Sequence, residues 1–279
     1  VNLVNNNDQV SQLNIKRKKS NYSINSKIFD GAKILDRILF SKSDGNFFDV
    51  FEKLNSKITI NFNTIYITNE DYLTNFKADM IVNNNQIKDL ILSSQFSTKE
   101  DLKLSIKTNS NNERITDLFA GNAKPLVKKY DFIKGFEGGY LKFDSIEKNK
   151  VSNSNLKIFD FKLKEVPALT KLLTLASLQG IADLLTGEGI RFNEFEMIFN
   201  NKDGLMTIEE IYSLGPSISI LMDGYIQKDD LVSLRGTLVP ATTVNKVIGS
   251  IPVLGDLLVG KKAGEGVFGV SFKIKGYPD

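Results

Sequence analysis

The sequence predicts a mainly β protein in which one long antiparallel sheet is apolar on a single face. Apolar and polar residues alternate over most of the 279-residue chain, as they do in strands with one buried face. Short segments rich in Asn, Asp, Ser and Lys separate these stretches and are typical of hairpin turns. Helical periodicity is confined to a few segments, so no helical layer is expected over most of the sheet.

The first half of the chain contains a series of alternating stretches. A phase slip after Thr64 would let Ile65 and Ile67 continue the first stretch on the same face, as a β-bulge does. Turn-forming residues at 83–85 and 97–101 separate later stretches, and we therefore expect an antiparallel meander. The apolar positions are Ile58/Ile60/Phe62, Phe76/Ala78/Met80/Val82, Leu90/Leu92 and Leu102/Leu104/Ile106.

The second half of the chain repeats this pattern. Its loops at 200–204 and 227–230 contain the Asn, Asp and Gly residues that tight turns favour. The apolar positions are Phe159/Phe161/Leu163, Phe195/Met197/Phe199, Ile218/Ile220/Met222, Val232/Leu234 with Leu238, and Phe268/Val270/Phe272/Ile274.

The clearest helix is expected from Pro167 to about Leu185. Proline suits the first helical position, and Gly187 suits the C-cap. Apolar residues cover a wide part of this helix, which either packs on the sheet or contacts lipid or a partner. Weaker helical patterns occupy 31–40, 47–54 and 115–130, the last interrupted by a proline.

The composition excludes most familiar catalytic chemistry. The chain has no histidine, cysteine or tryptophan, so zinc, haem and iron–sulfur sites lack their usual ligands and Ser–His–Asp or Cys–His systems are impossible. The carboxylate pairs Glu209-Glu210 and Asp229-Asp230 are adjacent in sequence and would point to opposite faces of a strand, which suits turns and solvent better than acid/base catalysis. We expect no enzyme activity and no cofactor.

The charge distribution gives little sign of a nucleic-acid-binding protein. The 36 basic and 33 acidic residues are interspersed, and the one basic run, Lys16-Arg17-Lys18-Lys19, fits a solvated strand end or loop. No stretch of 18 uncharged apolar residues occurs, and no signal-peptide pattern follows Val1. We expect the chain to be a piece of a longer protein.

Three glycines near the C-terminus match the spacing of a dinucleotide-binding loop. Gly264, Gly266 and Gly269 fit G-x-G-x-x-G, but they precede the alternating stretch 267–274. In a nucleotide site such glycines follow a strand and open a helix. We therefore interpret them as a flexible loop that enters the sheet.

Three motifs in residues 156–279 resemble the C-terminal region of the AsmA-like family (AsmA/TamB/YhdP type). They read VPALTKLLTLASLQGIADLLTGEGI, GPSISILMDGYIQKDDLVSLRGTLVP and LVPATTVNKVIGSIPVLGDLLVGKKAGEGVFGVSFKIKG. The preceding 1–155 resemble the family's strand-rich part by pattern. The third motif contains, in order, Pro240, Asn245, Gly249, Pro252, Gly255, Gly260, Gly264 and Gly266.

The resemblance implies a curved sheet that forms an open apolar groove, a half-barrel, for phospholipid transport between inner and outer membrane. It implies a periplasmic protein anchored to the inner membrane through a segment absent from this chain. Its organisation would be a groove segment at 1–155 and a C-terminal region at 156–279, with the helix 167–185 and a terminal motif at 238–272. The motif would either cap an edge strand or dock on an outer-membrane protein or a lipid surface.

The candidate groove residues are the apolar positions of the strands. In an ordinary β-sandwich the same residues would form the core against a second sheet, so both interpretations stay open. An alternative function is a structural or assembly factor for outer-membrane biogenesis that acts through protein partners. The candidates are Ile58, Ile60, Phe62, Met80, Val82, Leu90, Leu92, Leu102, Leu104, Ile106, Phe159, Phe161, Phe195, Met197, Phe199, Ile218, Ile220 and Met222.

Overall fold

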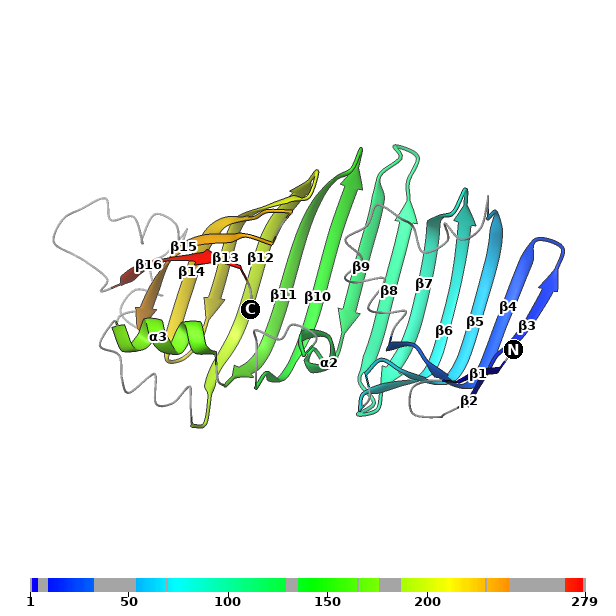
Figure 1. The fold of residues 1–279 in the computed structure, drawn as a ribbon, viewed down its shortest axis with the longest axis horizontal. Coiled ribbons are helices and arrows are strands. Elements are labelled where there is room, and N and C mark those ends of the chain that lie inside the picture. The colour runs from blue at the N-terminus through cyan, green and yellow to red at the C-terminus, as the bar shows by residue number, and fades with distance from the viewer. Residues whose placement is uncertain are drawn as a thin grey trace. The chain divides into compact units, whose positions relative to one another are not determined.

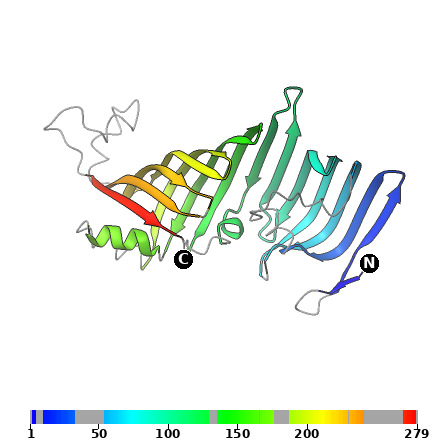
Figure 2. The same ribbon diagram turned by 45° about the horizontal axis from the view of Figure 1, so that its top comes forward.

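The computed structural model describes residues 2–4, 10–32, 54–68, 70–128, 135–164, 166–175, 187–228, 230–240 and 269–277. Fourteen strands form one sheet in the order β16-β15-β14-β13-β12-β11-β10-β9-β8-β7-β6-β5-β4-β3. Figures 1 and 2 show this succession of strands from two directions. The order has two ends, β16 and β3, so the sheet is open. The predicted mainly β fold with an open sheet is confirmed.

The strands are mostly consecutive in the chain, and two short helices accompany them. The sheet strands are β3 (Asn14–Lys18), β4 (Asn21–Asp30), β5 (Ser56–Tyr66), β6 (Tyr72–Asn83), β7 (Gln86–Phe96), β8 (Asp101–Thr108), β9 (Arg114–Ala120), β10 (Glu137–Lys148), β11 (Val151–Leu163), β12 (Ile190–Lys202), β13 (Leu205–Leu214), β14 (Ile218–Ile226), β15 (Val232–Pro240) and β16 (Val270–Gly276). A separate pair joins β1 (Asn2–Val4) to β2 (Val10–Gln12), and the helices are α2 (Lys124–Val127) and α3 (Pro167–Leu175).

The chain divides into two compact units. Unit 1 comprises Val1–Pro125 with Lys142–Lys148, and unit 2 comprises Leu126–Leu141 with Asn149–Asp279. The two units are described separately below.

Tight turns set the register of several hairpins. Asn84 and Asn85 connect β6 to β7 with φ of 48° and 63°, and Asp203 and Gly204 connect β12 to β13 with φ of 53° and 83°. Positive φ at both central residues is the geometry of the two-residue turn that matches strand twist, and Asn, Asp and Gly tolerate it best. Both turns fall inside the turn segments expected from sequence.

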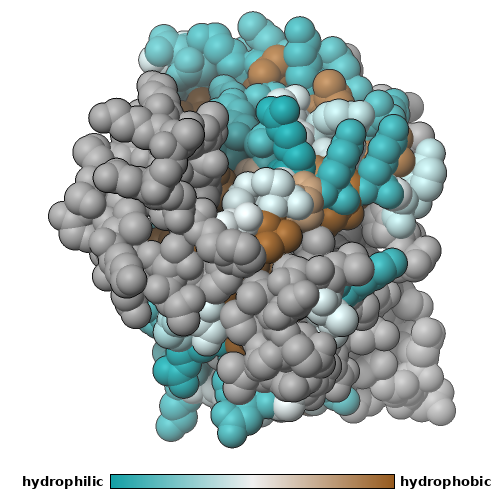
Figure 3. Space-filling view, turned by 90° about the vertical axis from the view of Figure 1, so that its left-hand side faces the viewer, coloured by the Kyte–Doolittle hydropathy of each residue, from teal (hydrophilic) through white to brown (hydrophobic). Residues whose placement is uncertain are grey.

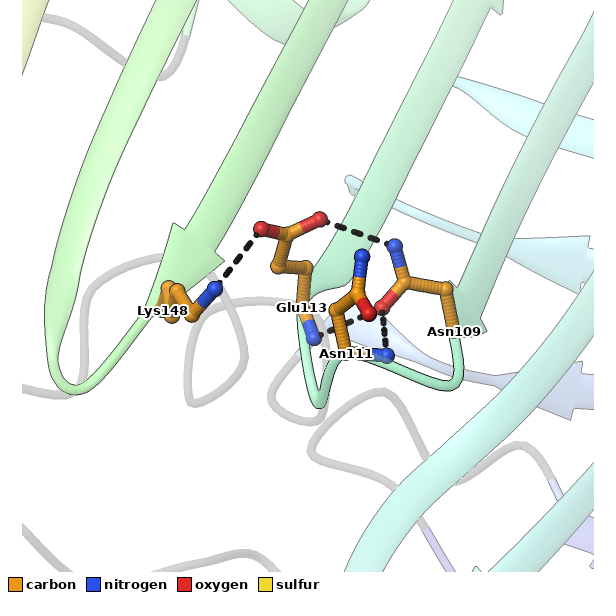
Figure 4. A network of polar contacts seen from close by, with 4 residues as sticks. All are labelled: Asn109, Asn111, Glu113 and Lys148. Atoms are coloured by element: carbon orange, nitrogen blue, oxygen red, sulfur yellow. Dashed lines mark hydrogen bonds and ion pairs between the residues drawn. The ribbon is translucent and has the colours of Figure 1, made fainter.

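A longer turn between β8 and β9 is held by side chains (Figure 4). The Asn109 side-chain oxygen accepts hydrogen bonds from the backbone N–H groups of Asn111 and Glu113, both at 3.0 Å. Its amide donates to Glu113 Oε2 at 2.9 Å, while Lys148 Nζ at the end of β10 lies 3.0 Å from Glu113 Oε1. The Asn109 hydrogen bond, followed by the Lys148 contact, holds the pKa of Glu113 below its usual value.

Two expectations from sequence are wrong in detail. The segment expected to be helical from 115 onwards begins as strand β9, whose Ile115 and Thr116 favour a strand and whose neighbour β8 supplies the pairing. The phase slip expected after Thr64 is absent, because β5 keeps one register against β6 from Ser56 to Tyr66. The irregularity lies instead between Thr74 and Lys77 of β6, where Asn75 has a φ of 53°.

One strand pair departs from the antiparallel pattern. β4 runs parallel to β5, with Tyr22 opposite Ile58 and Ile24 opposite Ile60. A parallel pair needs a crossover connection, and the intervening residues 33–53 lie outside the described part of the chain.

The helices expected at 31–40 and 47–54 fall almost wholly in that segment. Likewise, α3 confirms the helix that begins at Pro167, while 176–186 is not described.

Candidate functional site

In unit 1 the sheet has one apolar face, built from rows of side chains that lie opposite one another across strands. One row runs Ile58–Met80–Leu90–Ile106 through β5 to β8, and the next runs Ile60–Ala78–Leu92–Leu104. Paired residues of neighbouring strands project from the same face, so these rows form a single surface. The remaining candidates join it, since Phe62 lies opposite Phe76, Val82 opposite Ser56 and Leu102 opposite Ser94. We call this surface the unit 1 apolar face.

The unit 1 apolar face mixes buried and half-buried side chains. Val82 is 2% exposed and Leu90 is 6% exposed, so neither is available to a large ligand. The half-buried members pack against the buried ones, and they are Ile60, Phe76, Met80, Ile87, Leu92 and Leu104. They are the part of the surface that another molecule could contact.

The opposite face of unit 1 is polar. Its central row runs Thr59–Asp79–Ile91–Ser105–Asp117. Hydroxyl groups on this face donate to carboxylates, as Thr59 Oγ1 does to Asp79 Oδ1 at 2.7 Å. Ile91 is an exception to the polarity, and it is 61% exposed. A one-residue change of position along β7, from Ile91 to Leu92, therefore moves a side chain from the polar to the apolar face.

Unit 2 has an apolar face of the same construction. Three neighbouring rows cross strands β12 to β16: Phe199–Ile208–Gly224–Leu234–Ile274, Met197–Ile211–Met222–Gly236–Phe272 and Phe195–Ser213–Ile220–Leu238–Val270. Ile218, at the next position on this face of β14, is 0% exposed. The other five candidates of β12 and β14 also belong to this surface, and all five are half-buried. We call it the unit 2 apolar face.

Sequence reasoning missed several members of these faces. Strand β13, which contributes Ile208 and Ile211, was not recognised, because the alternation breaks between these residues at a register shift. Tyr22 and Ile24 of β4 also pack on the unit 1 apolar face beside Ile58 and Val82. A search that allowed one extra residue in an alternating stretch would have found β13.

All four methionines of the chain lie on the two apolar faces. Met80 belongs to unit 1, and Met197, Met206 and Met222 belong to unit 2. Each is half-buried. Methionine is flexible and polarisable, and it is favoured on surfaces that adapt to apolar ligands of variable shape.

Two candidates do not belong with the others. The face of unit 2 opposite its apolar face carries the row Asp223–Arg235–Lys273, and we call it the polar face of unit 2. Phe159 lies opposite Glu194 on this face, and its ring stacks on Tyr140 at 4.9 Å. Phe161 is 4% exposed because its ring is stacked between Phe136 at 5.3 Å and Phe192 at 5.4 Å. The chain's own aromatic residues fill that position, which makes Phe161 a core residue.

The second layer that a β-sandwich requires is missing from the described residues. The only other sheet there is the two-stranded β1–β2 pair, and α2 and α3 span four and nine residues. Viewed from the side on which β16 lies, the surface shows hydrophobic residues among hydrophilic ones (Figure 3). Among the described residues, no second sheet of comparable size covers the half-buried apolar side chains.

The polar face of unit 2 contains one buried carboxylate. Glu196 is 8% exposed, and it accepts hydrogen bonds from Tyr212 Oη at 2.6 Å and Asn155 Nδ2 at 2.6 Å. Lys157 Nζ lies 3.0 Å from the same carboxylate. Burial works to raise the pKa of Glu196, but the hydrogen bonds from Tyr212, Lys157 and Asn155 together lower it. Burial, with the carboxylates of Glu196 and Glu194, raises the pKa of Tyr212.

This cluster has the composition of a structural network. Its single tyrosine hydroxyl can donate to one of the two carboxylates at a time, either Glu196 or Glu194, whose Oε1 lies 3.0 Å away.

The pair Glu209-Glu210 lies in β13, where Glu209 accepts a hydrogen bond from Asn200 at 3.0 Å. Within the described ranges, no group of three or more Asp or Glu side chains is placed to hold a metal ion.

Most of the C-terminal motif lies outside the described residues. Pro240 ends β15 opposite Ile218, while Asn245, Gly249, Pro252, Gly255, Gly260, Gly264 and Gly266 lie outside the described residues. The strand expected after the glycines is confirmed as β16. In the part of the chain that is described, no helix has the length and apolar character needed to cross a membrane.

Comparison of the chain with protein-family models, curated proteins and solved structures found no significant match.

Proposed function

We propose that the chain transports phospholipid without chemical catalysis, holding acyl chains against the apolar faces of its sheet in the periplasm between inner and outer membrane. The observation that carries this proposal is the exposure pattern of the two faces. Each joins apolar side chains from at least four neighbouring strands, and many of them stay half-buried rather than buried. The resemblance of residues 156–279 to the AsmA-like family favours this compartment and an anchor to the inner membrane outside the chain.

The energetics of acyl chains explain why such a surface is useful. A phospholipid has about 30 methylene groups, and exposing both chains to water costs on the order of 25 kcal/mol. An apolar face that runs across successive strands lowers this cost wherever the chains rest on it. The polar face on the other side of each unit keeps the protein hydrated, and no reactive group is needed.

Phospholipid bound to the purified chain is the direct test. We expect mass spectrometry of organic extracts to detect phospholipid, and a lipid-free chain would contradict the proposal. Stable binding of an outer-membrane protein without lipid would instead favour an assembly factor.

A matched pair of variants locates the binding surface. Leu92→Asp places a charge on the unit 1 apolar face, and Ile91→Asp places the same charge on the polar face of the same strand. Burying a leucine side chain contributes roughly 1.5–3 kcal/mol, so we expect Leu92→Asp to weaken lipid retention about tenfold or more. Urea unfolding checks that both variants fold, and Leu92→Ser replaces Leu92→Asp if the charge prevents folding. Equal retention by the two variants would argue against binding to this face.

A further inference from the structure

The net positive charge of the protein is concentrated in the β3–β4 hairpin. Residues 14–30 contain five basic residues and one acidic residue, a net charge of +4, whereas the whole chain has a net charge of +3. The rest of the chain, with 31 basic and 32 acidic residues, is therefore slightly negative. Such asymmetry points to a negatively charged partner for this hairpin.

The four consecutive cations lie at one end of the strand order. β3 pairs only with β4 in the described sheet, and all five of its residues are exposed. Lys16 and Lys18 lie opposite Ser23 and Asn21, on the polar side of the hairpin. No carboxylate of the described residues is within ion-pairing distance of Lys16, Arg17, Lys18 or Lys19.

Arg17 is placed differently from the lysines. It lies opposite Tyr22, which packs on the unit 1 apolar face beside Ile58 and Val82. Its guanidinium carbon is 5.6 Å from the centre of the Tyr22 ring, and its Nε donates a hydrogen bond to the Lys19 carbonyl at 2.8 Å. The cation is thus held at the border of the apolar face.

Exposed apolar side chains accompany these cations. Ile15 of β3 is 47% exposed and Ile28 of β4 is 48% exposed, and both rank among the most exposed large hydrophobic residues of the described chain. Charged residues at a sheet edge prevent edge-to-edge aggregation, but that role requires neither exposed isoleucines nor an arginine stacked on an aromatic ring. Basic residues with apolar neighbours suit the interface of an anionic bilayer, where cations meet phosphates and apolar side chains enter the acyl boundary.

We propose that the β3–β4 hairpin docks unit 1 on an anionic phospholipid surface. Docking at this edge places the border of the unit 1 apolar face, marked by Arg17 and Tyr22, beside the headgroups. The inference that lipid passes between the bilayer and the apolar face at this border rests on the proposed function, whereas the docking itself does not.

Vesicle sedimentation of the full chain tests the proposal. We expect binding to vesicles of phosphatidylcholine with phosphatidylglycerol, weak binding to phosphatidylcholine alone, and weaker binding at high salt. The variant K16Q/R17Q/K18Q/K19Q should lose roughly tenfold or more in partitioning. The matched control K57Q/K77Q/K107Q/K275Q removes four exposed charges elsewhere and should bind nearly as well as the wild type.

A second variant separates a bilayer from other polyanions. Ile15→Ser leaves the charge unchanged, so it should weaken vesicle binding while leaving any binding to single-stranded DNA unaffected. The proposal is overturned if the wild type does not distinguish the two vesicle types, if the control loses as much as the hairpin variant, or if Ile15→Ser has no effect on vesicle binding.

Bound lipid is measured on the same preparations. If K16Q/R17Q/K18Q/K19Q no longer binds vesicles but still carries phospholipid, the variant has lost docking and has kept its acyl-chain binding. Docking by a wild-type chain that carries no phospholipid would leave the docking proposal standing and remove the transport proposal.

Discussion

At the scale of single residues, the buried Glu196 is the most consequential polar group that the structure describes. It is 8% exposed, and its carboxylate is surrounded by the hydroxyl of Tyr212, the amide of Asn155 and the ammonium of Lys157. A buried carboxylate without partners would be costly, and these three donors stabilise its charged form. The cluster ties together β11, β12 and β13 on the polar face of unit 2.

The lowered pKa of Glu196 makes this contribution dependent on pH. A carboxyl group whose pKa is lower in the folded state than its usual 4.5 stabilises the fold above that value and loses the effect as pH falls through the folded pKa. We expect Glu196→Gln to reduce the free energy of unfolding by about 1–3 kcal/mol at neutral pH, because it removes hydrogen bonds to a charged group. Urea unfolding from pH 7 down to pH 3 should show this difference shrinking below about pH 4.5.

Glu209→Gln is the matched control for this measurement. Glu209 lies on the next strand, is exposed and accepts a hydrogen bond from Asn200. Its substitution should change the free energy of unfolding by no more than about 0.5 kcal/mol. A destabilisation by Glu196→Gln that stayed constant at all pH values would show that lost packing, rather than charge, is responsible.

At the scale of elements, close contact between β14 and β15 depends on a glycine. Gly224 has a φ of 152°, and a side chain there would clash with the backbone carbonyl of Ser233. Backbone on the neighbouring strand cannot move aside without loss of sheet hydrogen bonds. We expect Gly224→Ala to lower the free energy of unfolding by about 1–3 kcal/mol, as overpacked sites do, in a urea titration.

Gly276 provides the comparison within the same sheet. An added Cβ there meets no atom within 4 Å, so Gly276→Ala should be nearly neutral. Similar losses in the two variants would contradict a specific clash at Gly224, because the effect of alanine on the unfolded chain stabilises the fold rather than destabilising it.

Elements were predictable where one period ran without interruption. The stretches of β5 to β8 were recognised, and their turns were placed by residues such as Asn84 and Asn85 that tolerate positive φ. Strand β13 was missed because a register shift interrupts its alternation of apolar and polar residues. Strand β9 was predicted to be helical because its seven residues are followed by the short helix α2, and together they resemble one longer helical stretch. Pairing with a neighbouring strand determined the secondary structure of these two segments. The local sequence pattern does not show which strand will lie beside a segment.

At the scale of the molecule, the four methionines report on whether the apolar faces are occupied. Met80, Met197, Met206 and Met222 are half-buried on these faces, and oxidation by peroxide follows access to the sulfur. We expect lipid-loaded protein to be oxidised at these sites several-fold more slowly than protein stripped of lipid, since acyl chains cover the thioethers. Peptide mass spectrometry after timed exposure to peroxide measures each site separately.

The same experiment distinguishes the two faces. Protection at Met80 alone would confine lipid to unit 1, and protection at the other three would confine it to unit 2. Equal oxidation of stripped and loaded protein at all four sites would contradict acyl-chain binding to either face.

The sequence by itself determined the mainly β class, the alternation within most strands, several hairpin turns and the absence of histidine and cysteine chemistry. These properties follow from residue type and spacing along one strand, which local sterics and hydrophobic burial control. Only the tertiary structure decided which apolar residues are sealed, as Phe161 is, and which stay accessible, as Leu92 does. Alternation assigns a side chain to a face, but its exposure depends on the strands and rings that pack beside it, and these come from distant parts of the chain.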